Sequence, residues 1–130
     1  MQKITTFLMF EGKAEEAMKF YTSLFEHSSL LDVQRYGPNE GGPVGTIKKA
    51  VFTLAGQEFI CIDSPIKHGF GFTASMSLFV NCVSESEIDR LFASLCGDGK
   101  VMMPLAPYPF SKKFGWVADK YGVSWQLTLG

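Results

Sequence analysis

The sequence of 130 residues is poor in metal-binding side chains and has no strong excess of either charge. It contains two histidines and three cysteines, and its net charge is -1. The cysteines Cys61, Cys82 and Cys96 are odd in number and form no CxxC pair, which argues against a disulfide framework or a zinc ribbon. We expect reduced, buried thiols in a cytoplasmic protein. Without a basic patch, nucleic-acid binding is not expected either.

Long apolar runs are absent as well. The longest are of strand length, so the sequence predicts no membrane-spanning helix. The N-terminus enters a strand pattern at Ile4 without an apolar run and a small-residue cleavage site, so we expect no signal peptide. The chain does contain 46% hydrophobic residues, including 12 phenylalanines, which is enough for the core of one domain.

Two series of elements with the same order follow each other along the chain. Each begins with a strand, continues with an amphipathic helix and ends with three strands. The first series covers 1–63, a linker covers 64–73, and the second series covers 74–130. The strands are predicted at 4–10, 30–36, 46–54, 57–63, 74–83, 101–105, 113–119 and 123–129. The pattern predicts an α+β fold of two βαβββ modules that form a curved, mostly antiparallel sheet around a cleft, with the helices outside.

The C-terminal segment predicts two strands joined by a tight turn at 119–122. Asp119 can bond nearby backbone N–H groups, and Gly122 can adopt a positive φ. After the turn, apolar and polar residues alternate, which places Trp125 in the core and Gln126 on the opposite face. Further upstream, Met102–Phe110 is apolar and rich in proline. We expect this segment to be a stiff connector, or part of an interface or a cleft rim.

Two motifs carry a resemblance to a known family. They are Gly12-x-Ala14-Glu15-Glu16-Ala17-x-x-Phe20-Tyr21 and Phe114-Gly115-Trp116-x-x-Asp119-x-x-Gly122-Val123-x-Trp125-Gln126. With both in order, the chain resembles the PhnB-like branch of the vicinal oxygen chelate superfamily, also labelled 3-demethylubiquinone-9 3-methyltransferase-like. This superfamily includes glyoxalases, extradiol dioxygenases, and bleomycin- and fosfomycin-resistance proteins. The resemblance spans nearly the whole chain and implies the fold, but one fold hosts unrelated chemistries.

The resemblance also implies where a metal would bind. Metal-dependent members take His, Glu, His and Glu ligands from the first, fourth, fifth and eighth strands. Carried over, these positions fall on Thr6, on Asp63 or Cys61, on Ser75 and on Gln126. Neutral hydroxyls and amides bind transition metals weakly, so we expect no complete metal site and no cofactor. The resemblance then implies a ligand cavity lined by Thr6, Asp63, Ser75, Ser77, Trp116 and Gln126.

Two functions stay open. The first is a small-molecule binding module, as in bleomycin-resistance relatives, with an unidentified organic ligand and a homodimeric assembly. The alternative is a divalent-metal-dependent lyase, isomerase or dioxygenase, in which Asp63, Gln126 and the substrate complete the coordination. We expect the first. A methyltransferase is not expected, because the chain has no glycine-rich strand-to-helix turn for a nucleotide-type cofactor. His68, in a glycine- and phenylalanine-rich loop, is either a general base or an ordinary surface residue.

Overall fold

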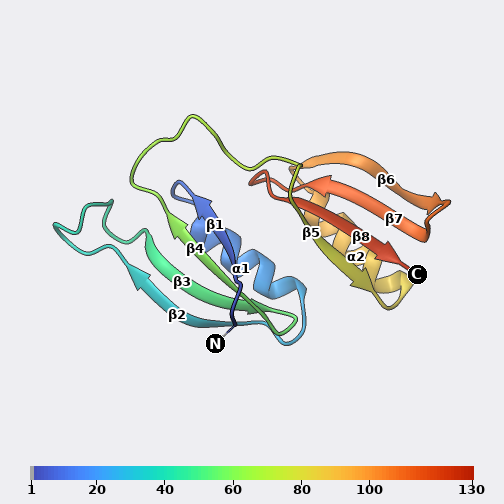
Figure 1. Ribbon diagram of the computed structural model, residues 1–130, viewed down its shortest axis with the longest axis horizontal. Coiled ribbons are helices and arrows are strands. Elements are labelled where there is room, and N and C mark those ends of the chain that lie inside the picture. The colour runs from blue at the N-terminus through green and yellow to red at the C-terminus, as the bar shows by residue number, and fades with distance from the viewer. Residues whose placement is uncertain (1) are drawn as a thin grey trace. The chain divides into compact units, whose positions relative to one another are not determined.

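A computed structural model describes residues 2–130 of the protein (Figure 1). The chain divides into two compact units, Met1–His68 and Gly69–Gly130, here called the first and second unit. Each unit consists of a four-stranded mixed sheet with one helix packed on it. The predicted α+β class and the repeated βαβββ order are therefore confirmed.

The first unit is built around a sheet with the strand order β1-β4-β3-β2, in which only the β1–β4 pair is parallel. Helix α1 buries Ala14, Ala17, Met18, Tyr21 and Leu24 on one side. This spacing is that of an amphipathic helix whose apolar stripe faces a core. The elements are β1 (Thr6–Phe10), α1 (Ala14–Leu24), β2 (Ser29–Arg35), β3 (Ile47–Leu54) and β4 (Gln57–Asp63).

The second unit repeats this arrangement with the strand order β5-β8-β7-β6, in which only the β5–β8 pair is parallel. Its helix starts at a capping box with the sequence Ser84-Glu85-Ser86-Glu87. The Ser84 hydroxyl accepts a hydrogen bond from the N–H of Glu87 (3.1 Å), and the Glu87 carboxylate accepts one from the N–H of Val83 (2.8 Å). The elements are β5 (Ser77–Cys82), α2 (Glu85–Cys96), β6 (Lys100–Tyr108), β7 (Ser111–Ala118) and β8 (Ser124–Leu129).

Strand β6 corrects one prediction. The expected strand ended at Leu105 and continued as a connector, whereas β6 extends to Tyr108 and includes both Pro104 and Pro107. It is an edge strand that pairs only with β7, and its register shifts repeatedly along the pair. Edge strands tolerate proline because one side of the backbone needs no ladder partner. The prediction for β5 is also corrected, because this strand starts at Ser77 rather than at Ala74.

Two of the three cysteines fit the expectation of reduced, buried thiols, and Cys96 is less buried than expected. All three are free, with Cys61 and Cys82 buried and Cys96 half-buried. Burial raises the pKa of Cys61 to about 12 and that of Cys82 to about 11, with smaller contributions from Asp63 and Glu87. Both buried thiols therefore stay protonated at neutral pH and are poor nucleophiles. Within residues 2–130, none of the helices has the length and apolar character needed to cross a membrane.

Gly115 sets the close approach of α2 to its sheet. A Cβ atom at this position would lie 2.5 Å from the ring of Phe92 on α2 and 3.2 Å from the Leu105 side chain. We expect Gly115→Ala to lower the free energy of unfolding by roughly 1–3 kcal/mol, because the added methyl group overpacks this contact. Urea unfolding followed by circular dichroism measures the change. Gly71→Ala, where no atom lies within 4 Å of the new Cβ, serves as control. Equal midpoints for both variants would contradict the packing described.

Candidate functional site

The sheet of the second unit has one face that carries α2 and one face turned away from it, here called the helix-free face. Gly115 contacts α2, so its strand neighbours Phe114 and Trp116 belong to the helix-free face. Cross-strand pairing then assigns Gln126 to the same face, since it lies opposite Trp116. The predicted alternation around Gln126 is thus confirmed: Trp125, at 2% exposure, lies in the core.

One row of side chains crosses the helix-free face at Gln126. Strand β5 places Phe79 in register with Gln126, and β7 places Trp116 in register on its other side. Gln126 and Trp116 are half-buried, while Phe79 is 55% exposed. An amide is therefore flanked by two aromatic side chains from neighbouring strands. We call Phe79, Gln126 and Trp116 the central row.

A chain of hydrogen bonds links the central row to two serines. The indole Nε1 of Trp116 donates to the Oγ of Ser124 (2.8 Å), which lies 2.7 Å from the Oγ of Ser77. The Nε2 of Gln126 donates to the Ser77 Oγ (3.1 Å). We call these four residues the polar chain. It fixes the orientation of the Trp116 ring and of the Gln126 amide.

The direction of the serine–serine bond follows from burial. The Ser124 oxygen accepts a hydrogen bond from Trp116, and the Ser77 oxygen accepts one from Gln126. In the bond between the two hydroxyl groups, one serine must be the donor and the other the acceptor. Ser124 is 2% exposed, and buried donors need partners, so Ser124 donates to Ser77. The Ser77 hydrogen is then left to donate outward. The Oε1 of Gln126 accepts no hydrogen bond from residues 2–130. The polar chain therefore offers a ligand one donor, the Ser77 hydroxyl, and one acceptor, the Gln126 Oε1.

The turn between β7 and β8 holds the central row in register. The Oδ1 of Asp119 accepts hydrogen bonds from the N–H groups of Tyr121 (2.9 Å) and Val123 (3.0 Å), and its Oδ2 accepts one from the Trp125 indole (2.9 Å). Gly122 adopts a φ of 92°, which favours glycine. The predicted role of Asp119 and Gly122 in the turn is confirmed. This turn fixes which β8 residue lies opposite Trp116.

Asp63 in the first unit has a comparable role. Its Oδ1 accepts hydrogen bonds from the N–H groups of Gly12 (2.7 Å) and Ala14 (2.9 Å), and its Oδ2 accepts one from Ile47 (2.9 Å). The carboxylate is only 3% exposed. It therefore holds together the start of α1, the loop before it and the start of β3, and both of its oxygens are engaged.

The face on which Thr6 lies follows from the β1–β4 register. Thr6 pairs with Phe59, and Leu8, two residues on, pairs with Cys61. The Cys61 Sγ lies 3.9 Å from the Sδ of Met18, so this face packs against α1. Thr6 and Asp63 thus lie on the helix side of their sheet. On the helix-free face of this sheet, β1 presents the apolar side chains of Phe7 and Met9, and β4 presents Ile60, Ile62 and one carboxylate, that of Glu58.

The remaining predicted residue, Ser75, precedes β5 and is exposed. Its Oγ lies 2.7 Å from that of Thr73, outside the polar chain. The structure therefore brings Ser77, Trp116 and Gln126 together in the second unit, with Ser75 outside this cluster. Thr6 and Asp63 belong to the first unit, on the helix side of its own sheet. Sequence reasoning missed Ser124 and Phe79 as members of this site. The sequence contains one indication of each. Ser124 lies two residues before Gln126, and Phe79 lies two residues after Ser77, so each shares a strand face with that residue.

The first unit also contains a cavity of about 230 Å³ next to Asp63, with Glu11, Thr46, Ser64 and Lys67 among its lining residues. The ring Nε2 of His68 lies 2.8 Å from the Ser64 Oγ, a partner that the sequence did not reveal. Within residues 2–130, no three His, Cys, Asp or Glu side chains gather closely enough to hold a metal ion. The polar groups beside this cavity bond mainly to their own loops.

The paired βαβββ units define the class: this is the fold of the vicinal oxygen chelate superfamily. The profile of the family described as 3-demethylubiquinone-9 3-methyltransferase matches residues 2–128. The chain therefore belongs to this PhnB-like family. No curated protein matches the chain.

Solved structures support this assignment. A PhnB protein from Bacillus cereus, whose description carries the same methyltransferase name, is 64% identical over 99% of this chain and 100% of its own, with a TM-score of 0.98. Protein PA1353 from Pseudomonas aeruginosa is 25% identical over 99% and 98% of the two chains, with a TM-score of 0.84. The fosfomycin resistance protein FosX from Listeria monocytogenes, 11% identical over 100% and 93%, has a TM-score of 0.62 and shares the fold.

Proposed function

We propose that the protein binds a small organic molecule on the helix-free face of the second unit, without a complete transition-metal site. The observation that carries this proposal is the polar chain. It places a free amide oxygen and a free hydroxyl hydrogen beside two aromatic side chains, in a half-buried setting. Ligand sites are commonly apolar surfaces with a few fixed polar groups.

The side chains argue against a metal at this face. Gln126 stands where metal-dependent relatives carry a carboxylate, and its amide nitrogen already bonds Ser77. Asp63 is the strongest metal ligand among the candidates, but both of its carboxylate oxygens accept hydrogen bonds from backbone N–H groups. Within the first unit, the helix-free face of β1 and β4 carries one carboxylate, Glu58, among apolar side chains, which is too few strong ligands for a complete site. Weak neutral donors do not compete well for transition metals.

The reaction in the family's description is not carried over to this protein. A methyltransferase of the nucleotide-binding type needs a glycine-rich turn from a parallel strand into a helix. Here the turn from β1 into α1 reads Glu11-Gly12-Lys13, and the turn from β5 into α2 contains no glycine. We expect no heat of binding for S-adenosylmethionine in a calorimetric titration.

The test combines metal analysis with ligand binding. The untagged protein is incubated separately with Mn, Fe, Ni and Zn, desalted, and assayed for retained metal by mass spectrometry. A library of small organic fragments is then titrated in EDTA into nitrogen-labelled protein. The indole N–H of Trp116 and the side-chain amide of Gln126 serve as NMR reporters. We expect little retained metal and saturable shifts of both reporters.

Two variants sharpen this result. Gln126→Leu removes the amide from the central row, and Gln57→Leu removes an exposed amide from the first unit as a matched control. Fragment binding should weaken in the first and persist in the second. Near-stoichiometric metal that disappears in Gln126→Leu would overturn the proposal and favour a metal-dependent lyase, isomerase or dioxygenase. Failure of every fragment to shift the reporters would also reject it.

A further inference from the structure

We infer that the ligand is an uncharged, planar aromatic molecule whose edge carries a hydrogen-bond donor next to an acceptor, as the amide group of a lactam does. This inference rests on the binding function proposed above. It follows from three properties of the helix-free face of the second unit, namely its aromatic flanks, its lack of central charge and its hydrogen-bonding pattern.

The aromatic flanks favour a flat ligand. Phe79 and Trp116 lie on strands that both neighbour β8, so their backbones are separated by about two strand spacings, or roughly 10 Å. A planar ring system resting over Gln126 reaches both. The indole nitrogen of Trp116 is already engaged by Ser124, so this side chain offers its apolar ring surface rather than its donor. Aromatic rings pair well in offset or edge-to-face contacts.

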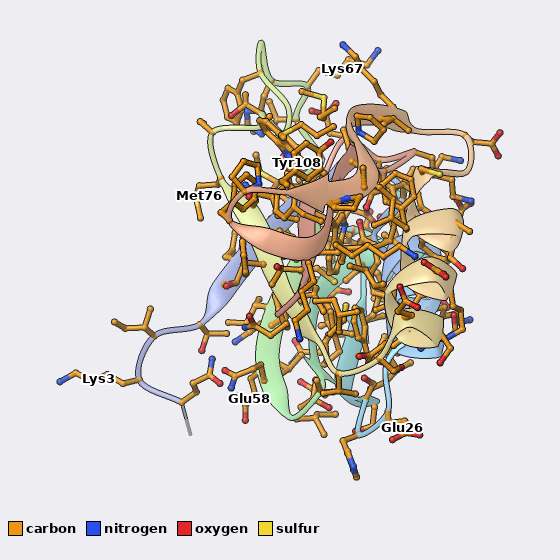
Figure 2. The ribbon with its side chains drawn as sticks, turned by 90° about the vertical axis from the view of Figure 1, so that its right-hand side faces the viewer. Lys3, Glu26, Glu58, Lys67, Met76 and Tyr108 are labelled. Atoms are coloured by element: carbon orange, nitrogen blue, oxygen red, sulfur yellow. The ribbon has the colours of Figure 1, made fainter. Side chains whose placement is uncertain are left out.

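Another group of aromatic residues, from β6, β7 and the turn between them, borders the site. The ring centroids of Tyr108 and Phe110 lie 5.6 Å apart in a stacked arrangement, and Phe114 meets both edge-on. Tyr108, labelled in Figure 2, comes from the end of edge strand β6. Its hydroxyl donates to the Pro104 carbonyl (2.7 Å), which holds the ring. The aromatic character of this face therefore extends beyond the central row.

The central part of this face carries no charge. The residues of the central row and those two positions before and after it on β5, β7 and β8 are serines, amides, a threonine, aromatics and an alanine. Lys100 is the first residue of β6 and Lys112 is the second residue of β7, so both lie at the margins, where they are exposed. Taking a charged ligand out of water over the uncharged centre would cost free energy with no counter-charge to offset it. A neutral ligand avoids this cost.

The hydrogen-bonding pattern specifies the ligand's edge. The free Oε1 of Gln126 needs a donor, and the outward hydrogen of the Ser77 hydroxyl needs an acceptor. These two groups are adjacent, since the Gln126 amide nitrogen bonds the Ser77 oxygen. A lactam supplies an N–H to the first and a C=O to the second in one plane. A hydrocarbon of the same shape would leave both groups dehydrated and unpaired.

Three probes of nearly equal size test this class. 2-Quinolone has the required donor and acceptor, N-methyl-2-quinolone lacks the donor, and 2-naphthoate is planar but anionic. Each is titrated into nitrogen-labelled protein with the Trp116 indole and Gln126 amide signals as reporters. We expect 2-quinolone to shift both reporters saturably. N-methylation should weaken binding about 3- to 10-fold through the loss of one hydrogen bond, and 2-naphthoate should bind more weakly than 2-quinolone.

Two substitutions test whether the preference for 2-quinolone depends on the Gln126 side chain. Gln126→Met should reduce the affinity for 2-quinolone to that for its N-methyl derivative, while Gln57→Met should leave all three affinities unchanged. The probe series in the unaltered protein decides the question even if Gln126→Met folds poorly. Equal binding of both quinolones, or tighter binding of 2-naphthoate, would overturn the ligand class and leave the binding function standing. If no probe and no library fragment shifts the reporters, both proposals fail.

Discussion

Asp63→Asn is expected to lower the free energy of unfolding by about 3 kcal/mol. The carboxylate accepts three backbone hydrogen bonds, from Gly12, Ala14 and Ile47, in a buried position. Asparagine has nearly the same shape, but its NH₂ group would face at least one of these N–H donors. That contact loses a charge-assisted bond and leaves two buried donors facing each other. The remaining bonds weaken because the acceptor is neutral.

Urea unfolding in EDTA measures this effect, with circular dichroism as the signal. Asp32→Asn is the matched control, since Asp32 is exposed on β2 in the same unit and its carboxylate accepts a hydrogen bond from the exposed Gln34 side chain. We expect its midpoint to stay within the range of ordinary surface substitutions, about 0.5 kcal/mol. Asp63 would be a metal ligand rather than a structural anchor if Asp63→Asn kept full stability in EDTA but lost a metal that the parent protein retains.

Much of the fold follows from local patterns in the sequence. The residues that α1 buries are spaced as its helical periodicity predicts, and the start of α2 coincides with the local capping-box pattern at Ser84. For β6, the sequence predicts a strand that is too short, because its C-terminal part is rich in proline and proline is depleted within strands. That rule depends on whether the strand lies at an edge. The sequence does not show which strand neighbours which, so the continuation of β6 to Tyr108 could not be predicted.

The candidate site was predictable only where alternation is clear. Strand β8 alternates cleanly, so the face of Gln126 could be assigned from the sequence. Strand β1 is apolar on both faces, from Phe7 on one to Leu8 on the other, so periodicity could not decide where Thr6 points. Ser124 and Phe79 needed the register of the parallel pair β5–β8, whose strands are separated by a helix and two further strands.

Asp63 shows a further limit of sequence reasoning. A carboxylate at the end of a strand resembles a ligand for a metal as closely as it resembles a partner for backbone N–H groups. The three donors that it meets come from segments 16 to 51 residues away in the sequence. Only the folded arrangement shows that its oxygens are already used. The same ambiguity was smaller at Asp119, because its partners lie within six residues.

Asp119→Asn is expected to cost about 3 kcal/mol of unfolding free energy and to disturb the central row. The Asp119 carboxylate accepts bonds from two turn N–H groups and from the buried indole of Trp125. An amide in its place would direct an NH₂ group at one of these donors, as at Asp63. Because this turn sets the β7–β8 register, the Trp116 indole and Gln126 amide signals should shift, although the carboxylate of Asp119 bonds to Tyr121, Val123 and Trp125.

A second variant distinguishes an effect of the β7–β8 turn on the site from the effect of general destabilisation. Asp98→Asn lies in the exposed turn after α2, with a φ of 59° that asparagine tolerates well, so its stability and its spectrum should change little. Urea unfolding and the indole region of the NMR spectrum are recorded for both variants. If Asp119→Asn is destabilised but the Trp116 and Gln126 signals keep their positions, the turn stabilises the unit without setting the geometry of the site. If those signals move and affinity for 2-quinolone falls with them, a residue outside the site determines how its donor and acceptor are presented.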